Sequence, residues 1–117
     1  MYINGWNKEK VMAQIRLKNN GSRAFENEQC KYRTDNNNAC LVGCFIPDEK
    51  YKLSMDTDGS NGAQIVIKNY NLGRFMPLDN KQMSFLQSLH DDELEDYNGE
   101  EFYKTIENYL SQFDTAS

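Results

Sequence analysis

The chain has 117 residues, of which 38% are apolar and 26% are charged, and its net charge is −5. This length and composition exclude a disordered chain and predict a single compact domain over residues 1–117. No apolar stretch approaches the ~20 residues of a membrane span, and the first residues lack a leader pattern. We therefore expect no membrane contact and a cytoplasmic location.

Charge is distributed unevenly along the chain. Residues 1–33 contain seven basic and three acidic side chains, whereas residues 91–117 contain one basic and nine acidic side chains. Because phosphate binding needs clustered lysine and arginine, this balance disfavours direct contact with nucleic acid. It would suit a basic surface of another protein, including one that itself binds nucleic acid, although a solvated helix face is the plain alternative. The candidate binding residues are Asp91, Asp92, Glu93, Glu95, Asp96, Glu100 and Glu101.

The first predicted element is a helix over residues 8–19. Its apolar residues Val11, Met12 and Ile15 recur at helical spacing, and Asn7 is suited to cap the first turn. Gly21 follows two asparagines and is a typical stop, because glycine readily adopts positive φ.

Residues 30–46 predict two extended arms joined by a turn. The turn residues 35–38 are Asp-Asn-Asn-Asn, whose side chains bond their own backbone and tolerate positive φ. Residues 40–46 form an apolar run that favours a buried strand, with a short helix as the alternative. Further along, alternation within residues 63–75 predicts a small hairpin, with Ala63, Ile65 and Ile67 on one face.

Two more helices are predicted near residues 80–91 and 99–113. Asp79 is placed to cap the first of them. The second has the clearest apolar stripe in the chain, and Asn98 is its expected cap.

Together these elements predict an α+β fold, with three main helices packed on a small antiparallel sheet. The sheet would be built from the 30–46 arms and the 63–75 region. The predicted core consists of Val11, Ile15, Leu41, Phe45, Ile65, Ile67, Leu86, Leu89, Phe102, Ile106 and Leu110.

Three cysteines and a single histidine set the limits on metal and thiol chemistry. Cys30, Cys40, Cys44 and His90 could form a zinc site, but the spacings C-x9-C and C-x3-C are not the paired knuckles typical of zinc modules. In an extended segment the second and third cysteines would lie roughly 13 Å apart, at ~3.3 Å per residue. A cysteine nucleophile, Cys40 or Cys44, would have to use His90 as its base. Buried, reduced cysteines without a cofactor are the simpler interpretation.

Three short blocks carry a family resemblance. They are C-x-Y-R from Cys30, C-x-V-G-x-x-I-P-D-x-x-Y from Cys40 to Tyr51, and L-Q-x-x-H-D from Leu86 to Asp91. The chain resembles small, uncharacterised proteins of tailed bacteriophages and prophages, over about 80 residues. The resemblance implies an accessory role inside an infected bacterium and assigns no activity.

The residues of the first two blocks also have a direct physical interpretation. Arg33 and Asp48 lie near the ends of arms that a turn brings together, and we expect a bidentate ion pair between them. Gly43 would allow close backbone approach. The structural motif predicted in this way comprises Cys30, Tyr32, Arg33, Cys40, Gly43, Pro47, Asp48 and Tyr51.

These observations favour a non-enzymatic protein that binds a host protein through its acidic surface. Inhibition of a host defence system or of a host enzyme would fit this role. The alternatives are a module stabilised by zinc and an enzyme that depends on a cysteine. Both alternatives rest on the cysteine and histidine residues named above.

Overall fold

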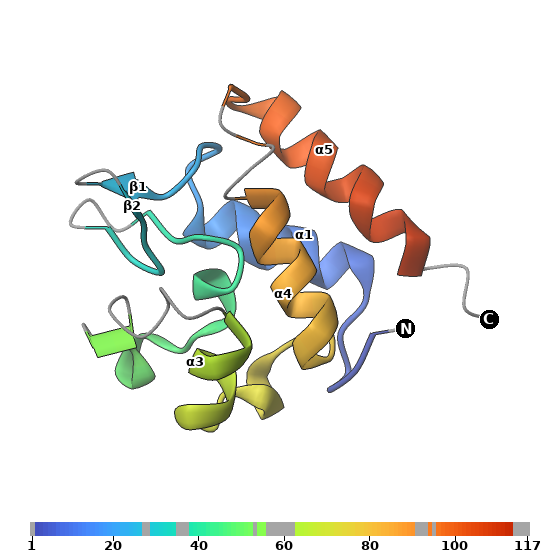
Figure 1. Ribbon diagram of the computed structural model, residues 1–117. Coiled ribbons are helices and arrows are strands. Elements are labelled where there is room, and N and C mark those ends of the chain that lie inside the picture. The colour runs from blue at the N-terminus through green and yellow to red at the C-terminus, as the bar shows by residue number, and fades with distance from the viewer. Residues whose placement is uncertain are drawn as a thin grey trace.

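Helices dominate the computed structural model, which describes residues 2–26, 29–34, 38–52, 54–55, 63–90, 94 and 96–113 (Figure 1). For residues 25, 26, 29 and 30 the description covers the backbone alone. The α-helices are α1 (Lys8–Lys18), α3 (Ala63–Asn69), α4 (Asn80–Ser88) and α5 (Glu100–Leu110). Short 3-10 turns complete the helical content: η1 (Gly43–Phe45), η2 (Asp48–Lys50), η4 (Gly73–Phe75) and η6 (Ser111–Phe113).

The predicted α+β fold is wrong, because the described residues contain no sheet on which helices could pack. The only strands among them, β1 (Phe25–Glu26) and β2 (Gln29–Cys30), pair over two residues each, with Phe25 opposite Cys30. Beyond this pair, Arg33 and Ala39 form an isolated antiparallel bridge. The predicted arms therefore meet, but they do not extend into a sheet.

The predicted hairpin over residues 63–75 is also wrong, because this region forms α3 and η4. Ala63, Val66 and Ile67 are buried, and their spacing is that of a helix face. Ile65, predicted to be in the core, is 40% exposed. The apolar pattern is so short that it fits both the two-residue repeat of a strand and the ~3.6-residue repeat of a helix. Packing against α4 favours the helix.

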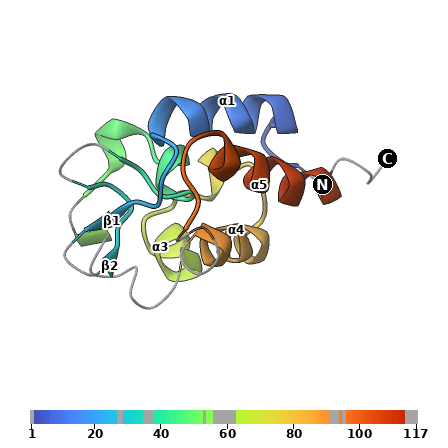
Figure 2. The ribbon, with the colours of Figure 1, turned by 90° about the horizontal axis from the view of Figure 1, so that it is seen from above.

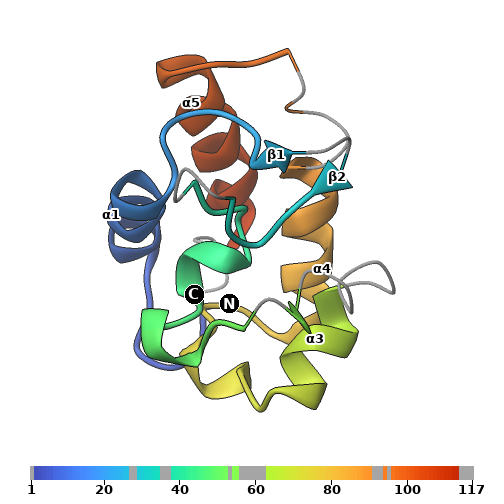
Figure 3. The same ribbon diagram turned by 90° about the vertical axis from the view of Figure 1, so that its left-hand side faces the viewer.

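The apolar run 40–46 lies between α1 and α4, as Figure 3 shows for the turn η1. Every residue from Ala39 to Ile46 is buried. The run is thus part of the core as predicted, but it adopts a turn and η1 and not a strand. Seen from above in Figure 2, α1 and the α3–α4 pair occupy opposite sides, with α5 between them.

Side chains on the helices supply hydrogen bonds that a sheet would otherwise supply to this run. Gln14 of α1 donates to the Cys44 carbonyl at 2.8 Å, and the Val42 amide donates to Gln87 of α4 at 3.1 Å. Buried backbone groups need such partners, so these contacts fix the irregular segment between the two helices.

Asn19, directly after α1, is the polar centre of the next turn and is almost fully buried. Its side chain donates to the carbonyls of Ser22 and Ala39 and accepts from the Gly21 amide. Its own carbonyl accepts the Tyr103 hydroxyl of α5. One residue therefore ties the end of α1 to two distant parts of the chain.

The helix ends match the sequence predictions at two of three caps. Asn7 accepts from the Lys10 amide, and Asp79 forms a reciprocal capping box with Gln82. Asn98 is not the cap of α5, because Gly99 occupies that place with φ +64° and no side-chain cap. The Gly99 amide donates instead to the Gly21 carbonyl at 2.8 Å. Gly21 has the positive φ that was predicted, +88°, but it does not end the helix, because α1 ends at Lys18 with Asn19 as its extended C-cap.

Ten of the eleven predicted core residues are buried, the exception being Ile65. The core also contains methionines and larger aliphatic residues outside that set, namely Met12, Val42, Ile46, Met55, Val66, Leu72, Met76, Leu78, Met83 and Leu94. None of the helices within the described residues has both the length and the apolar composition needed to cross a bilayer.

The substitution Gly43→Ala is expected to destabilise the fold strongly. A Cβ atom at this position would lie 2.1 Å from the Tyr32 carbonyl oxygen, which is backbone and cannot rotate away. We expect a loss of about 3 kcal/mol in the free energy of unfolding, the upper part of the range for overpacking, as measured by chemical denaturation. Gly73→Ala is the matched control, because nothing lies within 4 Å of its Cβ position. Equal stabilities of the two variants would contradict the close approach at Gly43.

Candidate functional site

Arg33 is the central side chain of the motif block. Its Nη1 donates to Asp48 Oδ1 at 2.7 Å, while Nη2 donates to the Ile46 carbonyl at 2.8 Å. A second, longer contact runs from Nη2 to the Gly43 carbonyl at 3.4 Å. The predicted pairing with Asp48 is present, but it is not bidentate, because the second nitrogen binds backbone carbonyls. Arg33 therefore joins the arm after β2 to both η1 and η2.

Lys18, at the end of α1, shares the carboxylate of Asp48. Its ammonium lies 3.2 Å from both oxygens. Hydrogen bonds from Arg33 and then from Lys18 lower the pKa of Asp48 below its ordinary value of 3.8. The side chain of Asp48 is 64% exposed, so the pair fixes geometry more than it adds stability.

Tyr51 is the residue of the predicted motif that lies against Arg33 beside this ion pair. The Tyr51 ring lies 5.6 Å from the Arg33 guanidinium, and its hydroxyl is 3.5 Å from the Arg33 carbonyl. Tyr32 is buried and contacts Gly43 through its backbone, and Pro47 precedes η2. We use the name Arg33 bracket for the Arg33 side chain together with the residues that it contacts, namely Gly43, Ile46, Asp48 and Tyr51. Of Cys30 only the backbone is described, within β2.

Cys40, Cys44 and His90, which belong to the alternative sites, each contact a different backbone group. Cys40 Sγ accepts from the Gly43 amide at 3.2 Å, and the Cys44 thiol lies 3.9 Å from the Ala39 carbonyl. His90 Nε2 lies 3.0 Å from the Ala24 amide nitrogen. An amide can only donate, so Nε2 accepts and carries no proton. No group of three potential metal ligands occurs among the described residues, and the Cys30 sulfur lies outside them.

The Cys44 thiol is poorly suited to nucleophilic chemistry. It is fully buried, and desolvation raises its pKa to about 12. A nucleophilic cysteine requires the thiolate form and an electropositive, accessible setting. Cys40 and His90 are equally inaccessible to a substrate, since both are fully buried.

The predicted acidic surface is described only in part. Asp91, Asp92, Glu93 and Glu95 lie outside the described residues, whereas Asp96, Glu100 and Glu101 are exposed. Glu100 is bound by the two terminal nitrogens of Arg16 at 2.8 and 3.2 Å, and this contact lowers the pKa of Glu100. The same guanidinium lies 4.4 Å from the Tyr103 ring centroid. One of the acidic side chains near the end of the chain is therefore paired with a basic side chain of α1, where α1 packs against α5.

Glu101 and Glu107 belong to the exposed side of α5. No lysine or arginine within the described ranges forms an ion pair with either of them or with Asp96. We call Asp96, Glu101 and Glu107 the acidic face. Glu107 was not among the predicted binding residues, although its place in the acidic end of the chain was a sufficient signal.

A groove of about 320 Å³ lies beside the Arg33 bracket, and we call it the Trp6 groove. Its apolar lining consists of Trp6, Phe45, Ile46, Pro47 and Phe75. Its polar lining consists of Gln14, Lys18, Asp48 and Arg74. A neighbouring hollow of about 470 Å³ is lined by Leu17, Lys18, Arg33 and Asp48. Most of these residues had no local signal in the sequence, because the groove depends on three distant segments meeting.

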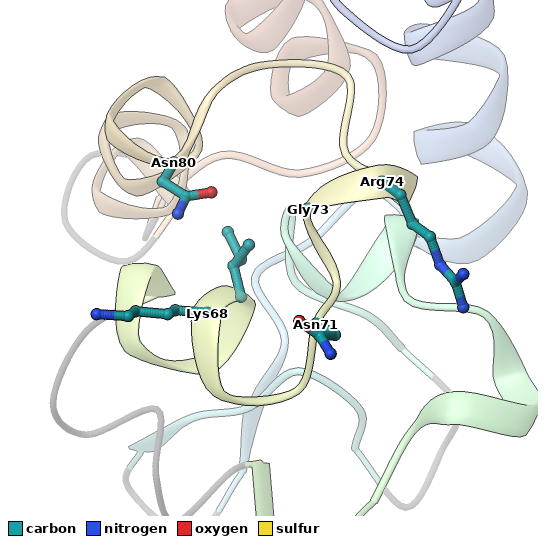
Figure 4. Close-up of a pocket in the computed structure, with 6 residues that line it drawn as sticks. Lys68, Asn71, Gly73, Arg74 and Asn80 are labelled. Carbon is teal, nitrogen blue, oxygen red and sulfur yellow. The ribbon is translucent and has the colours of Figure 1, made fainter.

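A third hollow, of about 440 Å³, lies between α3, η4 and the start of α4. Lys68 and Arg74 both line it, which raises the question of an anion site. In Figure 4, however, their side chains extend away from each other on opposite sides, and their charged ends do not converge. This hollow is not arranged to hold an anion.

Comparisons with known proteins returned no match: no family model, no curated protein and no solved structure is similar to this chain.

The ion pair at Asp48 is expected to make a small, pH-dependent contribution to stability. Because the pKa of Asp48 is lowered in the fold, the contribution is fully present above the unfolded pKa and is lost as pH falls through the folded pKa. We expect Asp48→Asn to cost less than about 1 kcal/mol at neutral pH, and the difference from the wild type to shrink below about pH 4. Denaturation curves at several pH values check this. A difference that grows on acidification would contradict the assignment.

The buried thiols are expected to resist modification in the native state. Cys30→Ser removes the thiol whose surroundings are not described and leaves Cys40 and Cys44. With iodoacetamide at about pH 8, we expect negligible labelling of the folded variant and full labelling in denaturant, as counted by mass spectrometry. Rapid labelling of either thiol in the folded protein would revive the cysteine-enzyme alternative.

Proposed function

We propose that this protein is a small, non-enzymatic interaction protein that binds a basic surface of another protein through its acidic face. The resemblance to phage and prophage proteins supports a host protein as the partner, including one that normally binds nucleic acid. Inhibition of a host defence system or of a host enzyme is the role that best fits such a contact. The function would be exerted in the cytoplasm of the bacterial host.

The observation that carries the proposal is the state of the carboxylates on and before α5. Asp96, Glu101 and Glu107 are exposed and form no ion pair with a described cation, although Glu100 beside them does. Exposed carboxylates without a cation partner in the chain contribute to a negative field outside the molecule. A partner that presents lysine and arginine would be attracted to this field at long range.

The surroundings of the reactive groups also favour binding over catalysis. Cys40, Cys44 and His90 are buried and engaged with backbone atoms. The same arrangement gives no specific support to a zinc-stabilised module, since each of these side chains has a different backbone neighbour.

The test compares two variants of equal charge. Glu101→Gln with Glu107→Gln neutralises the acidic face, while Glu9→Gln with Glu49→Gln removes two exposed carboxylates from α1 and η2. Each protein is immobilised and incubated with bacterial lysate, and captured proteins are identified by mass spectrometry. We expect capture of a basic protein that falls as salt rises from about 50 to about 300 mM, because exposed charges are screened.

We expect the α5 variant to lose that protein several-fold and the matched variant to retain it. An equal loss in both variants would mean that net charge alone is responsible, and would contradict a defined acidic face. Capture of no protein by the wild type at low salt would overturn the proposal.

A further inference from the structure

The Trp6 groove has a different chemistry from the acidic face and lies on another part of the molecule. Its walls come from the start of the chain, from α1, from the η1–η2 segment and from η4. Trp6 and Phe45 meet edge to face, with ring centroids 5.1 Å apart. Phe45 is buried beneath the groove, while Trp6 and Phe75 are only half-buried and remain accessible.

The groove is held in shape by contacts that need no ligand. Gln14 fixes the Cys44 carbonyl behind it, and Arg33 fixes the Ile46 carbonyl. On the opposite wall, the Asn4 amide donates to the Gly73 and Met76 carbonyls at 2.9 Å each. A preformed apolar site loses little conformational entropy on binding, so it can hold a side chain with useful affinity.

The charge of the groove is positive on a chain that is negative as a whole. Lys18 and Arg33 share the single carboxylate of Asp48. Arg74 forms no ion pair within the described part of the chain, and its guanidinium lies 4.8 Å from the centroid of the Phe75 ring. Within the lining of the groove, Lys18 and Arg74 stand against the single carboxylate of Asp48, which leaves an excess positive charge beside an apolar surface. An occupant that is complementary to both features carries a large apolar side chain next to an acidic one.

The shape favours an extended chain over a compact small molecule. The Trp6 groove and the neighbouring hollow are adjacent, because Lys18 and Asp48 line both, and an occupant that reaches both has to extend past this ion pair. At the far end Leu17 is 73% exposed, the most exposed of the large apolar side chains in the described ranges. A segment of several residues could place one apolar side chain against Trp6 and Phe75 and another against Leu17.

Single-stranded nucleic acid also combines stacking surfaces with negative charge, but the groove suits it less well. Trp6 presents its ring at 90° to Phe45, so the two rings do not form a stacking platform for successive bases. Asp48 lies in the lining, and a net charge of −5 opposes binding of a phosphate backbone.

We propose that the Trp6 groove docks a short acidic segment of a partner protein, with an aromatic or leucine side chain of that segment seated between Trp6 and Phe75. This contact goes beyond the proposed function. The acidic face attracts a basic surface, whereas the groove takes an acidic peptide, so either site can fail without the other.

The experiment is a selection from a random peptide library on the immobilised full chain, followed by fluorescence titration. The chain has one tryptophan, and because this residue lines the groove its emission reports occupancy directly. Selected peptides without tryptophan are titrated against the wild type, Arg74→Gln and the control Lys81→Gln, which removes an exposed charge of α4 outside the groove. Thermal melts confirm that each variant is folded.

We expect enriched peptides with an aromatic or leucine residue flanked by Asp or Glu, and a saturable change in Trp6 emission. Arg74→Gln should weaken binding about tenfold, the size of one charge-assisted contact, and Lys81→Gln should leave it unchanged. Enrichment of basic peptides alone, dependent on Glu101 and Glu107 and with no acidic peptide among them, would support the acidic face and overturn the groove. The groove would also be overturned if Arg74→Gln and Lys81→Gln bound the peptides equally well, or if no peptide were enriched. A change in Trp6 emission with oligothymidine but with no peptide would overturn it too.

Discussion

The fold depends on one constraint: a buried irregular segment has to satisfy its backbone polar groups without a sheet. Side chains at the end of α1 and in or just after α4 meet this need, both for the run itself and for the turn after α1. Asn19 binds the Ala39 carbonyl, Gln87 binds the Val42 amide, and His90 binds the Ala24 amide. Each contact joins positions at least twenty residues apart, so the same bonds that satisfy the backbone also determine which elements pack together. The apolar run is held between α1 and α4 because its polar atoms have partners on both sides.

Arg33 also satisfies a backbone group with its side chain, but it does so at the surface of the molecule. One terminal nitrogen holds the Ile46 carbonyl, as the buried amides hold other backbone atoms, and the other reaches Asp48 at the rim. The guanidinium therefore satisfies the carbonyl of a buried residue, Ile46, and at the same time fixes the position of Asp48 at the surface. Because Lys18 binds the same carboxylate, the end of α1 is fixed relative to η2, and the groove between them keeps its shape. A lysine in place of Arg33 could not serve both sides, since it lacks the planar fork.

Much of this fold could be predicted from local signals, and the failures have a common physical origin. The helix starts at Asn7 and Asp79 and most core positions depend on neighbours in sequence, and these predictions were confirmed. The sheet was wrong because residues 40–46 and 63–69 are short apolar stretches whose pattern fits a strand or a helix. Whether these stretches form a strand or a helical turn depends on contacts with Gln87 and the rest of α4, which come later in the chain. Arg33 with Asp48 could be predicted as a pair, whereas the Trp6 groove requires Trp6, Phe45 and Phe75 to converge, and no spacing rule links them.

The packing of α1 against α5 reduces the charge asymmetry that the sequence shows. Arg16 with Glu100 pairs one charge of the basic end with one charge of the acidic end across this interface, so the sequence charge overstates what is offered to a partner. What is left over is separated in space: carboxylates on the outer side of α5, and cations beside the aromatic lining of the groove. A uniformly acidic protein would repel acidic partners everywhere. Here the local excess of positive charge at Arg74 and Lys18 is short in range, because surrounding negative charge and salt screen it within about 10 Å. A basic surface would therefore be attracted by the acidic face from a distance, whereas an acidic segment would be recognised by the groove only on contact.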